Sequence, residues 1–212
     1  MLPVNELFTL QDRENILAWM AEWPRWLAVV NYRKIPPQKV KTVFYGDSIT
    51  DNFPLNEFFP NASLLNRGIG GDTADGLYFR LDEDVFPYHP EQVVMLIGIN
   101  GIERELDLIF RKITAVAFLM KEAGIKVWLA SVTPLRKPDQ CNRFRYQDKI
   151  VELNARLRES AERNFAGFLD YHSVLKDENG ELRADYARDD GTHLTFSGYQ
   201  AMAKLLADTV PL

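Results

Sequence analysis

The chain has 212 residues and a formal net charge of −5, a length that suits one α/β domain around a single buried core. Hydrophobic residues make up 46% of it and charged residues 26%, as in ordinary soluble globular proteins. The acidic balance and the lack of any basic run argue against a nucleic-acid partner, because binding to phosphates requires clustered Lys and Arg.

The N-terminus does not begin with basic residues followed by an apolar run, so it does not resemble a signal peptide. No stretch of the sequence approaches the roughly 18 apolar residues of a membrane span. We therefore expect a cytoplasmic protein from the sequence as it stands, or a secreted or periplasmic one if a leader precedes it. The single cysteine, Cys141, cannot form an internal disulfide, and we interpret it as an inert thiol beside a loop.

Residues 11–30 have the pattern of a helix with one apolar face, interrupted at Pro24. Trp19, Trp23, Trp26 and Leu27 lie in this segment and are candidates for an apolar face. We expect residues 1–40 to form a helical extension that packs on the domain's own helices. A surface for a homodimer is the alternative.

Five short apolar runs follow, and helical patterns separate the later ones. The runs cover residues 42–45, 64–66, 93–97, 127–132 and 167–171, and the helical patterns cover 73–85, 103–123, 143–164 and 195–210. Short continuous apolar strands that alternate with helices predict a parallel sheet buried on both faces, hence a three-layer α/β/α fold. Without internal repeats or a low-complexity linker, we expect residues 1–212 to form a single domain.

Three short polar motifs come directly after predicted strands, at residues 46–48, 70–72 and 98–100. Ligands of open α/β sheets bind outside the carboxyl ends of the strands. The three motifs are therefore predicted to converge on one rim of the sheet.

Ser48 follows the first run in Gly46-Asp47-Ser48. A serine at a turn from strand to helix projects its hydroxyl, and the helix N-terminus supplies backbone N–H groups. Taken alone, however, the tripeptide is better explained as a helix cap.

His193 is one of three histidines and lies in Asp190-Gly191-Thr192-His193. An aspartate three residues ahead of a histidine can hold its ring N–H, which sets the tautomer and stabilises the imidazolium. Asp-x-x-His alone is a weak motif. We interpret His89 as a loop residue and His172 as a packing residue.

Acyl transfer places negative charge on the former carbonyl oxygen, and one fixed donor aimed there contributes about 3 kcal/mol. The sequence offers the backbone N–H of Gly71, the side-chain amide of Asn100 and the backbone N–H of Ser48. A tight turn at Gly71 and a cap at Asn100 would be the structural explanations. The ordered combination of nucleophile, donors and Asp-x-x-His at one rim favours catalysis.

These blocks resemble those of the SGNH (GDSL-type) hydrolases, from about residue 41 to the C-terminus. Residues 46–50, 66–73, 98–100 and 190–193 resemble the four blocks of the family in order. The resemblance implies Ser48 as nucleophile, His193 as base and Asp190 as acid. It also implies Gly71, Asn100 and Ser48 as oxyanion donors, a flavodoxin-like sheet of five parallel strands, and no metal or organic cofactor.

One position departs from the family pattern. The family often has Asp or Glu after the third-block asparagine, where this chain has Gly101. We expect Asn100 to keep its role and the support of its loop to differ. Asp189 stands beside Asp190, and the spacing favours Asp190 as the partner of His193.

The function expected from the resemblance is a serine esterase that hydrolyses small-molecule esters of short acyl groups, acetyl foremost, with carbohydrates as candidate alcohols. No insertion is long enough for a lid, which favours a shallow site. Ile99, Ile102 and Leu135 either line the acyl side or belong to the core. A lysophospholipase, a thioesterase or an acyltransferase with the same triad are the alternatives, and a non-catalytic binding module is the least favoured.

Overall fold

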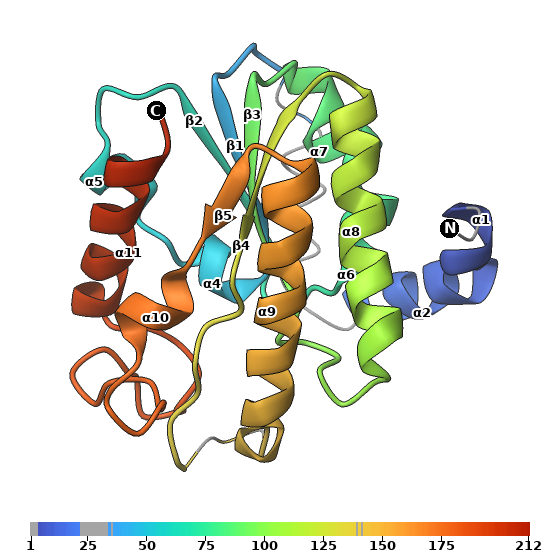
Figure 1. Cartoon of the computed structure of the whole chain (residues 1–212). Helices are drawn as coiled ribbons and strands as arrows, with labels where there is room; N and C mark the ends of the chain where they lie inside the picture. The colour runs from blue at the N-terminus through green and yellow to red at the C-terminus, as the bar shows by residue number, and fades with distance from the viewer. Residues whose placement is uncertain (1–3, 22–33, 35, 139, 141) are drawn as a thin grey trace.

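The computed structural model describes residues 4–21, 34, 36–138, 140 and 142–212, and it is built on one parallel sheet (Figure 1). The order in the sheet is β2-β1-β3-β4-β5, and every neighbouring pair is parallel. The strands are β1 (Thr42–Gly46), β2 (Leu64–Gly68), β3 (Gln92–Leu96), β4 (Lys126–Ala130) and β5 (Gly167–Leu169). The predicted flavodoxin-like sheet is confirmed.

Helices cover both faces of this sheet and form the outer two layers (Figure 1). Along β1, the side chains of Val43 and Tyr45 enter one apolar cluster, and that of Phe44 enters the other. The first cluster includes residues of α6 (Ala74–Phe79), α7 (Leu81–Asp84), α8 (Leu106–Glu122) and α9 (Gln147–Asn164). The second includes residues of α4 (Ser48–Asp51), α5 (Leu55–Phe58), α10 (Tyr171–Leu175) and α11 (Phe196–Thr209).

Two predicted elements differ from the structure. The helix expected at 73–85 is divided into α6 and α7 at Arg80, whose φ of −115° is not helical. The physical reason is the buried ion pairs that the Arg80 side chain forms with Asp72 and Asp84. The strand expected at 167–171 ends at Leu169, because Asp170 accepts a hydrogen bond from the Ser173 N–H and begins α10.

The N-terminal helices α1 (Val4–Leu7) and α2 (Leu10–Ala21) lie against α8 and α6. Leu7 and Phe8 are buried, and the Phe8 ring stacks on that of Tyr78 with centroids 4.0 Å apart. The Trp19 side chain and residues Trp23, Trp26, Leu27 and Cys141 lie outside the described part of the chain. The interpretation of residues 1–212 as one domain stays a prediction.

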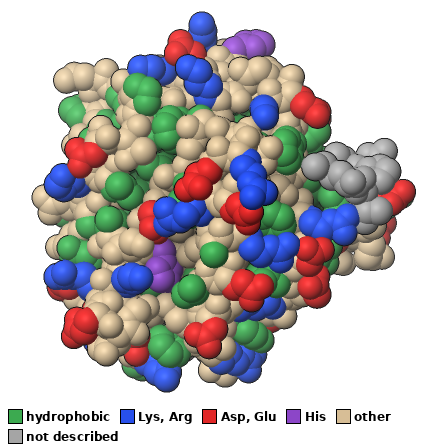
Figure 2. Space-filling view, in the orientation of Figure 1, with side chains coloured by type: hydrophobic (Ala, Val, Ile, Leu, Met, Phe, Trp, Pro, Cys, Tyr) green, Lys and Arg blue, Asp and Glu red, His purple; other side chains and the backbone are tan. Residues whose placement is uncertain are grey.

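Charges of both signs are interspersed over the face of the molecule shown in Figure 2. Within the described residues, no helix is both long enough and apolar enough to cross a membrane. The same residues contain no cluster of three His, Cys, Asp or Glu side chains that could hold a metal ion.

Candidate active site

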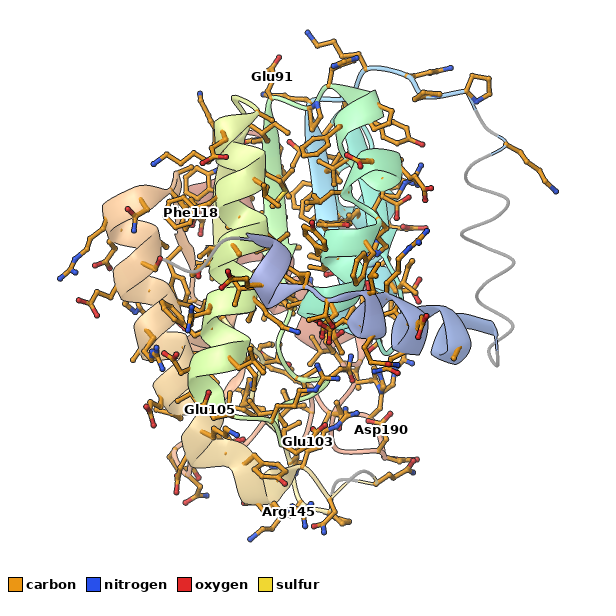
Figure 3. All side chains as sticks on the ribbon, turned by 90° about the vertical axis from the view of Figure 1, so that its right-hand side faces the viewer. Glu91, Glu103, Glu105, Phe118, Arg145 and Asp190 are labelled. Carbon is orange, nitrogen blue, oxygen red and sulfur yellow. The ribbon has the colours of Figure 1, made fainter. Side chains whose placement is uncertain are left out.

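The candidate residues lie at the carboxyl ends of the strands, as predicted. Figure 3 shows Asp190, Glu103 and Glu105 near one end of the molecule, and Glu91, which precedes β3, at the opposite end. Ser48 follows β1, Gly71 follows β2, and Asn100 follows β3. The sheet therefore brings to one rim residues that are far apart in the sequence.

Ser48 is the first residue of α4, and only 7% of its surface is exposed. Asp47 is the N-cap, because its Oδ1 accepts a hydrogen bond of 3.0 Å from the Ile49 N–H. The capping interpretation and the nucleophile interpretation thus apply to adjacent residues. The cap fixes the turn, and the turn presents the serine hydroxyl.

His193 lies between Ser48 and Asp190. Its Nε2 is 2.9 Å from the Ser48 Oγ, and its Nδ1 is 2.6 Å from the Asp190 Oδ2. The other carboxylate oxygen of Asp190 accepts hydrogen bonds of 2.8 Å from the backbone N–H groups of Thr192 and His193. The partner of the histidine ring is therefore Asp190, as the spacing predicted.

The environment of Asp190 favours its ionised form. Partial burial acts to raise the pKa of this carboxyl, but the backbone N–H groups of His193 and Thr192 and the His193 ring outweigh it and lower the pKa. The Asp190 carboxylate accepts a hydrogen bond from Nδ1, which places the ring proton on that nitrogen. The Nε2 of the neutral ring is then unprotonated and directed at the Ser48 hydroxyl. This tautomer is the one that can remove the serine proton.

The loop between β4 and α9 supports the loop at residues 190–193. The Arg136 N–H donates to the Gly191 carbonyl over 2.8 Å, and the Gln140 N–H donates to the Asp190 carbonyl over 3.1 Å. Sequence reasoning missed this support. These are backbone contacts between segments about 50 residues apart, so no side-chain pattern could have indicated them.

Gly71 and Asn100 lie on two loops that meet at the rim. Gly71 has a φ of 82°, a conformation that side chains rarely adopt, so the turn that presents its N–H favours glycine. The Asn100 amide donates one hydrogen to the Asp72 carbonyl over 2.9 Å. Its nitrogen carries a second hydrogen, which leaves one donor for an oxyanion.

A buried arginine connects the turn at residues 46–48 to the Gly71 loop. Arg80 is 3% exposed, and its guanidinium contacts the Asp72 carboxylate at 2.8 Å and the Asp84 carboxylate at 2.7 Å. It also donates to the carbonyl of Gly46, which ends β1, over 3.0 Å. Sequence reasoning missed Arg80 because an Arg and an Asp four residues apart usually form an exposed pair on a helix.

The carboxyl group of Asp47 is buried directly beside Ser48. Its exposed fraction is 0%, and its Oδ2 has no hydrogen-bond partner among the described residues. Burial raises the pKa of Asp47 to about 7, against the lowering effect of the Ile49 N–H. A proton therefore resides on this carboxyl over the acidic range.

The three apolar residues considered for the acyl side belong to the core. Ile99 is 1% exposed, and Ile102 and Leu135 are 0% exposed. All three pack in the cluster on the α8 and α9 face of the sheet. His89 is exposed in the turn that precedes β3, at the far end of the strands from Ser48, and His172 is buried in α10.

Comparisons with known proteins identify the family and agree with the fold. Residues 44–201 match the model of the GDSL-like lipase/acylhydrolase family. A solved structure of a GDSL-like lipase from Bacteroides thetaiotaomicron is 30% identical, with a TM-score of 0.73 over 85% of this chain and 97% of that one.

Two curated relatives are named for acetyl esters. An acetylxylan esterase from Geobacillus stearothermophilus is 31% identical over 122 residues, or 46% of this chain and 56% of that enzyme. The platelet-activating factor acetylhydrolase IB subunit alpha1 of Pongo abelii is 25% identical over 96% of this chain and 87% of that protein. The chain thus spans about half the length of the first relative and most of the second.

The three-layer fold and the family match define a hydrolase that acts on esters. The chain belongs to the GDSL-like lipase/acylhydrolase family, since the family model covers most of its length.

Proposed function

We propose that this protein is a serine esterase in which Ser48, His193 and Asp190 form a catalytic triad. The observation that carries the proposal is the continuous hydrogen-bonded path from the Asp190 Oδ2 through the His193 ring to the Ser48 Oγ. A packing histidine would need neither the carboxylate on one nitrogen nor the hydroxyl on the other.

In the first half-reaction, the His193 Nε2 takes the proton of the Ser48 hydroxyl as Oγ bonds to the ester carbonyl carbon. The carbonyl oxygen becomes an oxyanion that accepts hydrogen bonds from the N–H groups of Gly71 and Ser48 and from the free amide hydrogen of Asn100. The tetrahedral intermediate then collapses, the bond to the alcohol oxygen breaks, and His193 gives that oxygen its proton.

In the second half-reaction, water replaces the alcohol. His193 takes a proton from the water as the water oxygen bonds to the acyl carbon, and the same donors hold the second oxyanion. The bond to Ser48 Oγ then breaks, and His193 returns the proton to Oγ. The acid leaves, and the triad is restored.

We further propose a short acyl group, with acetyl foremost and a carbohydrate as a candidate alcohol. Two observations support this. The two curated relatives described above carry names that refer to acetyl groups. Ile99 and Ile102, the apolar residues that flank Asn100 in the sequence, are closed within the core and offer no surface to a long acyl chain.

The proposal is tested with a fluorophosphonate and a series of p-nitrophenyl esters. The wild-type protein should form a covalent adduct at Ser48 and should hydrolyse the acetate faster than the butyrate and the octanoate. Ser48→Ala should form no adduct and lose about 10⁴-fold or more in kcat with its fold intact. Retained hydrolysis in Ser48→Ala would contradict the triad.

The acyl preference and the acceptor are separate outcomes of the same assays. A maximum at the octanoate would contradict the acetyl assignment and favour a lipid or thioester substrate. Acetylated xylan should release acetate if a carbohydrate is the alcohol. If acetate appears mainly on an added alcohol and not as free acid, the protein is an acyltransferase.

A further inference from the structure

Gly71 and Asn100, two of the proposed oxyanion donors, lie on loops that the pairing of strands does not connect. Gly71 follows β2 and Asn100 follows β3, and β1 separates these strands in the sheet. No backbone hydrogen bond of the sheet therefore connects the two loops. Their spacing depends on side-chain contacts between them, and the Asn100 amide on the Asp72 carbonyl is the first of these.

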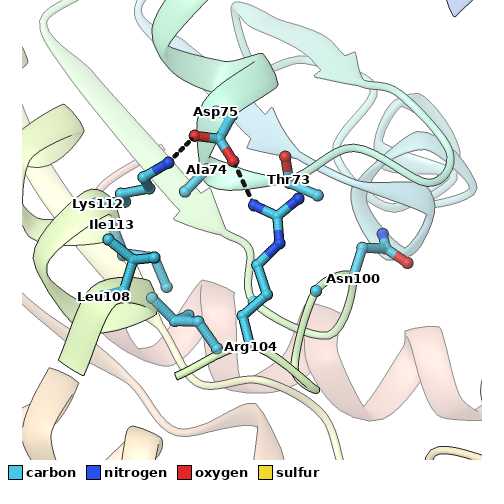
Figure 4. Close-up of a pocket in the computed structure, with 11 residues that line it drawn as sticks. Thr73, Ala74, Asp75, Asn100, Arg104, Leu108, Lys112 and Ile113 are labelled. Carbon is cyan, nitrogen blue, oxygen red and sulfur yellow. Dashed lines mark hydrogen bonds and ion pairs between the residues drawn. The ribbon is translucent and has the colours of Figure 1, made fainter. Parts of the chain in front are cut away.

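A second link joins the same loops farther from Ser48. Arg104 lies in the loop that carries Asn100, and its guanidinium contacts the Asp75 carboxylate of α6 at 2.7 Å. Figure 4 shows the Arg104 side chain extending across to Asp75, with Thr73 and Asn100 on its right and Lys112 on its left. A cavity of about 20 Å³ is lined by these residues, which is room for about one water molecule.

Asp75 is held on both of its oxygens. Its side chain is 3% exposed, and Lys112 of α8 contacts its other oxygen. The Lys112 Nζ also lies 3.4 Å from the Asp12 carboxylate of α2. A row of alternating charges therefore runs from the N-terminal helix through Lys112 and Asp75 to Arg104, and it ends at the Asn100 loop.

The exposures of the two cations differ, which separates their roles. Lys112 is 6% exposed and neutralises the buried carboxylate, whereas Arg104 is 46% exposed. Asp75 would keep its buried partner if Arg104 were replaced, so the burial of this charge does not require Arg104. What Arg104 adds is a connection from Asp75 to the loop of Asn100.

The local turn at Gly101 determines where the Arg104 side chain lies. Gly101 has a φ of +81°, a conformation that disfavours the acidic residue common at this position in the family. The Arg104 N–H closes a turn onto the Gly101 carbonyl over 3.0 Å. A Cβ placed on Gly101 would lie 3.5 Å from the Arg104 Nε, so the arginine stem covers the glycine.

We propose that Arg104 is a positioning residue for the oxyanion hole, which it serves by fixing the Asn100 loop against the Gly71 loop through Asp75. The inference rests on the proposed esterase function. Donors stabilise an oxyanion only when they are fixed at its position before the reaction, so loosening one loop lowers kcat. Arg104 itself does not touch the reacting atoms in this proposal, so KM is unaffected.

The test compares Arg104→Met and Arg104→Lys with Arg158→Met. Arg158 is a matched control, because its side chain is also 46% exposed and also pairs with an aspartate, Asp170. Arg104→Met should lower kcat for p-nitrophenyl acetate about ten-fold with KM within about two-fold. Arg104→Lys should recover most of the loss, and Arg158→Met should match the wild type.

Hydrogen–deuterium exchange supplies a readout that does not depend on activity. Arg104→Met should exchange about three-fold faster in both segments 69–73 and 99–105, as expected for the loss of one partly buried ion pair. The control variant should leave both segments unchanged. If the methionine variant does not fold, Arg104→Gln, which keeps a donor, takes its place in both measurements.

Each outcome decides the proposal. Unchanged kcat together with unchanged exchange overturns it. A raised KM with unchanged kcat and exchange also overturns it and makes Arg104 a substrate contact. If the wild-type protein hydrolyses no ester, the proposed function fails, and the exchange of the two segments still decides whether Arg104 positions the loops.

Discussion

The turn at residues 46–48 and the loop at residues 190–193 meet at one rim but are stabilised in different ways. Ser48 is 7% exposed, and the turn before it is held by Arg80, a buried side chain that also binds Asp72 and Asp84. His193 and Asp190 have side chains that are 31% and 26% exposed, and they are held by each other and by nearby backbone N–H groups.

This difference separates stability from chemistry. Substitutions around the turn at residues 46–48 disturb the buried network of Arg80 and should lower the free energy of unfolding. Substitutions in the loop at residues 190–193 remove a hydrogen bond near the surface and should lower kcat with little change in the free energy of unfolding. The following variants test that separation.

The largest effect is expected for His193→Ala. Without the imidazole, no described group remains to take the Ser48 proton, so kcat for p-nitrophenyl acetate should fall about 10⁴-fold or more. The thermal midpoint should stay close to that of the wild type, because the ring is partly exposed. His89→Ala, at the opposite end of the strands, is the control and should retain full activity.

Asp190→Asn should lower kcat by up to about 10⁴-fold, less than the loss of the histidine, because the ring remains but its tautomer is no longer set. The adjacent Asp189→Asn is the matched control, since Asp189 is exposed and the bond to the histidine ring comes from Asp190. Steady-state kinetics on both variants measures the difference. Equal losses in the two would contradict the assignment of Asp190.

Arg80→Met should act on stability first. The substitution leaves the buried carboxylates of Asp72 and Asp84 without their main partner, which should cost about 3–5 kcal/mol of unfolding free energy. Denaturant unfolding measures this. Arg163→Met, which removes a 72%-exposed arginine paired with Glu159, should change stability by at most about 1 kcal/mol. Similar values for the two would show that the turn does not depend on the buried network.

The effect of Asp47→Asn falls on stability and depends on pH. Burial raises the folded-state pKa of Asp47 from 3.8 to about 7. Between these values the unfolded chain loses the proton while the folded chain keeps it, so this group reduces stability progressively as pH rises from about 4 to about 7. Above pH 7 its penalty is constant.

The asparagine variant lacks this titration and can still accept the Ile49 N–H through its side-chain oxygen. Its unfolding free energy relative to the wild type should therefore increase between pH 4 and pH 7 and then level off. Urea unfolding at several pH values measures the difference. A constant difference across that range would show that Asp47 is ionised in the folded protein.

The sequence predicted the parallel sheet because apolar runs of strand length alternate with helical patterns. It also predicted the positions of Ser48, Gly71, Asn100 and the Asp190–His193 pair at the rim, since each motif directly follows a strand or precedes a helix. The local signal at Ser48 was ambiguous, and the structure shows why. Asp47 caps the helix, and Ser48 follows it with its hydroxyl directed at His193.

The sequence did not predict the break at Arg80 or the bridge from Arg104 to Asp75. Helical periodicity continues through Arg80, whereas in the structure the helix breaks there and the side chain is directed inward to the carboxylates and the Gly46 carbonyl. Arg104 and Asp75 are 29 positions apart, with a strand between them. No local pattern pairs them.

The amino-acid sequence by itself determined the fold class and the set of residues at the rim, because periodicity and strand-end motifs are local properties. Only the tertiary structure decided which partners meet there: His193 with Ser48 across 145 positions, Asp190 in preference to Asp189, and the Asn100 loop with the Gly71 loop. The physical reason is that distances of 2.6 to 2.9 Å between distant segments are set by sheet order and buried charges.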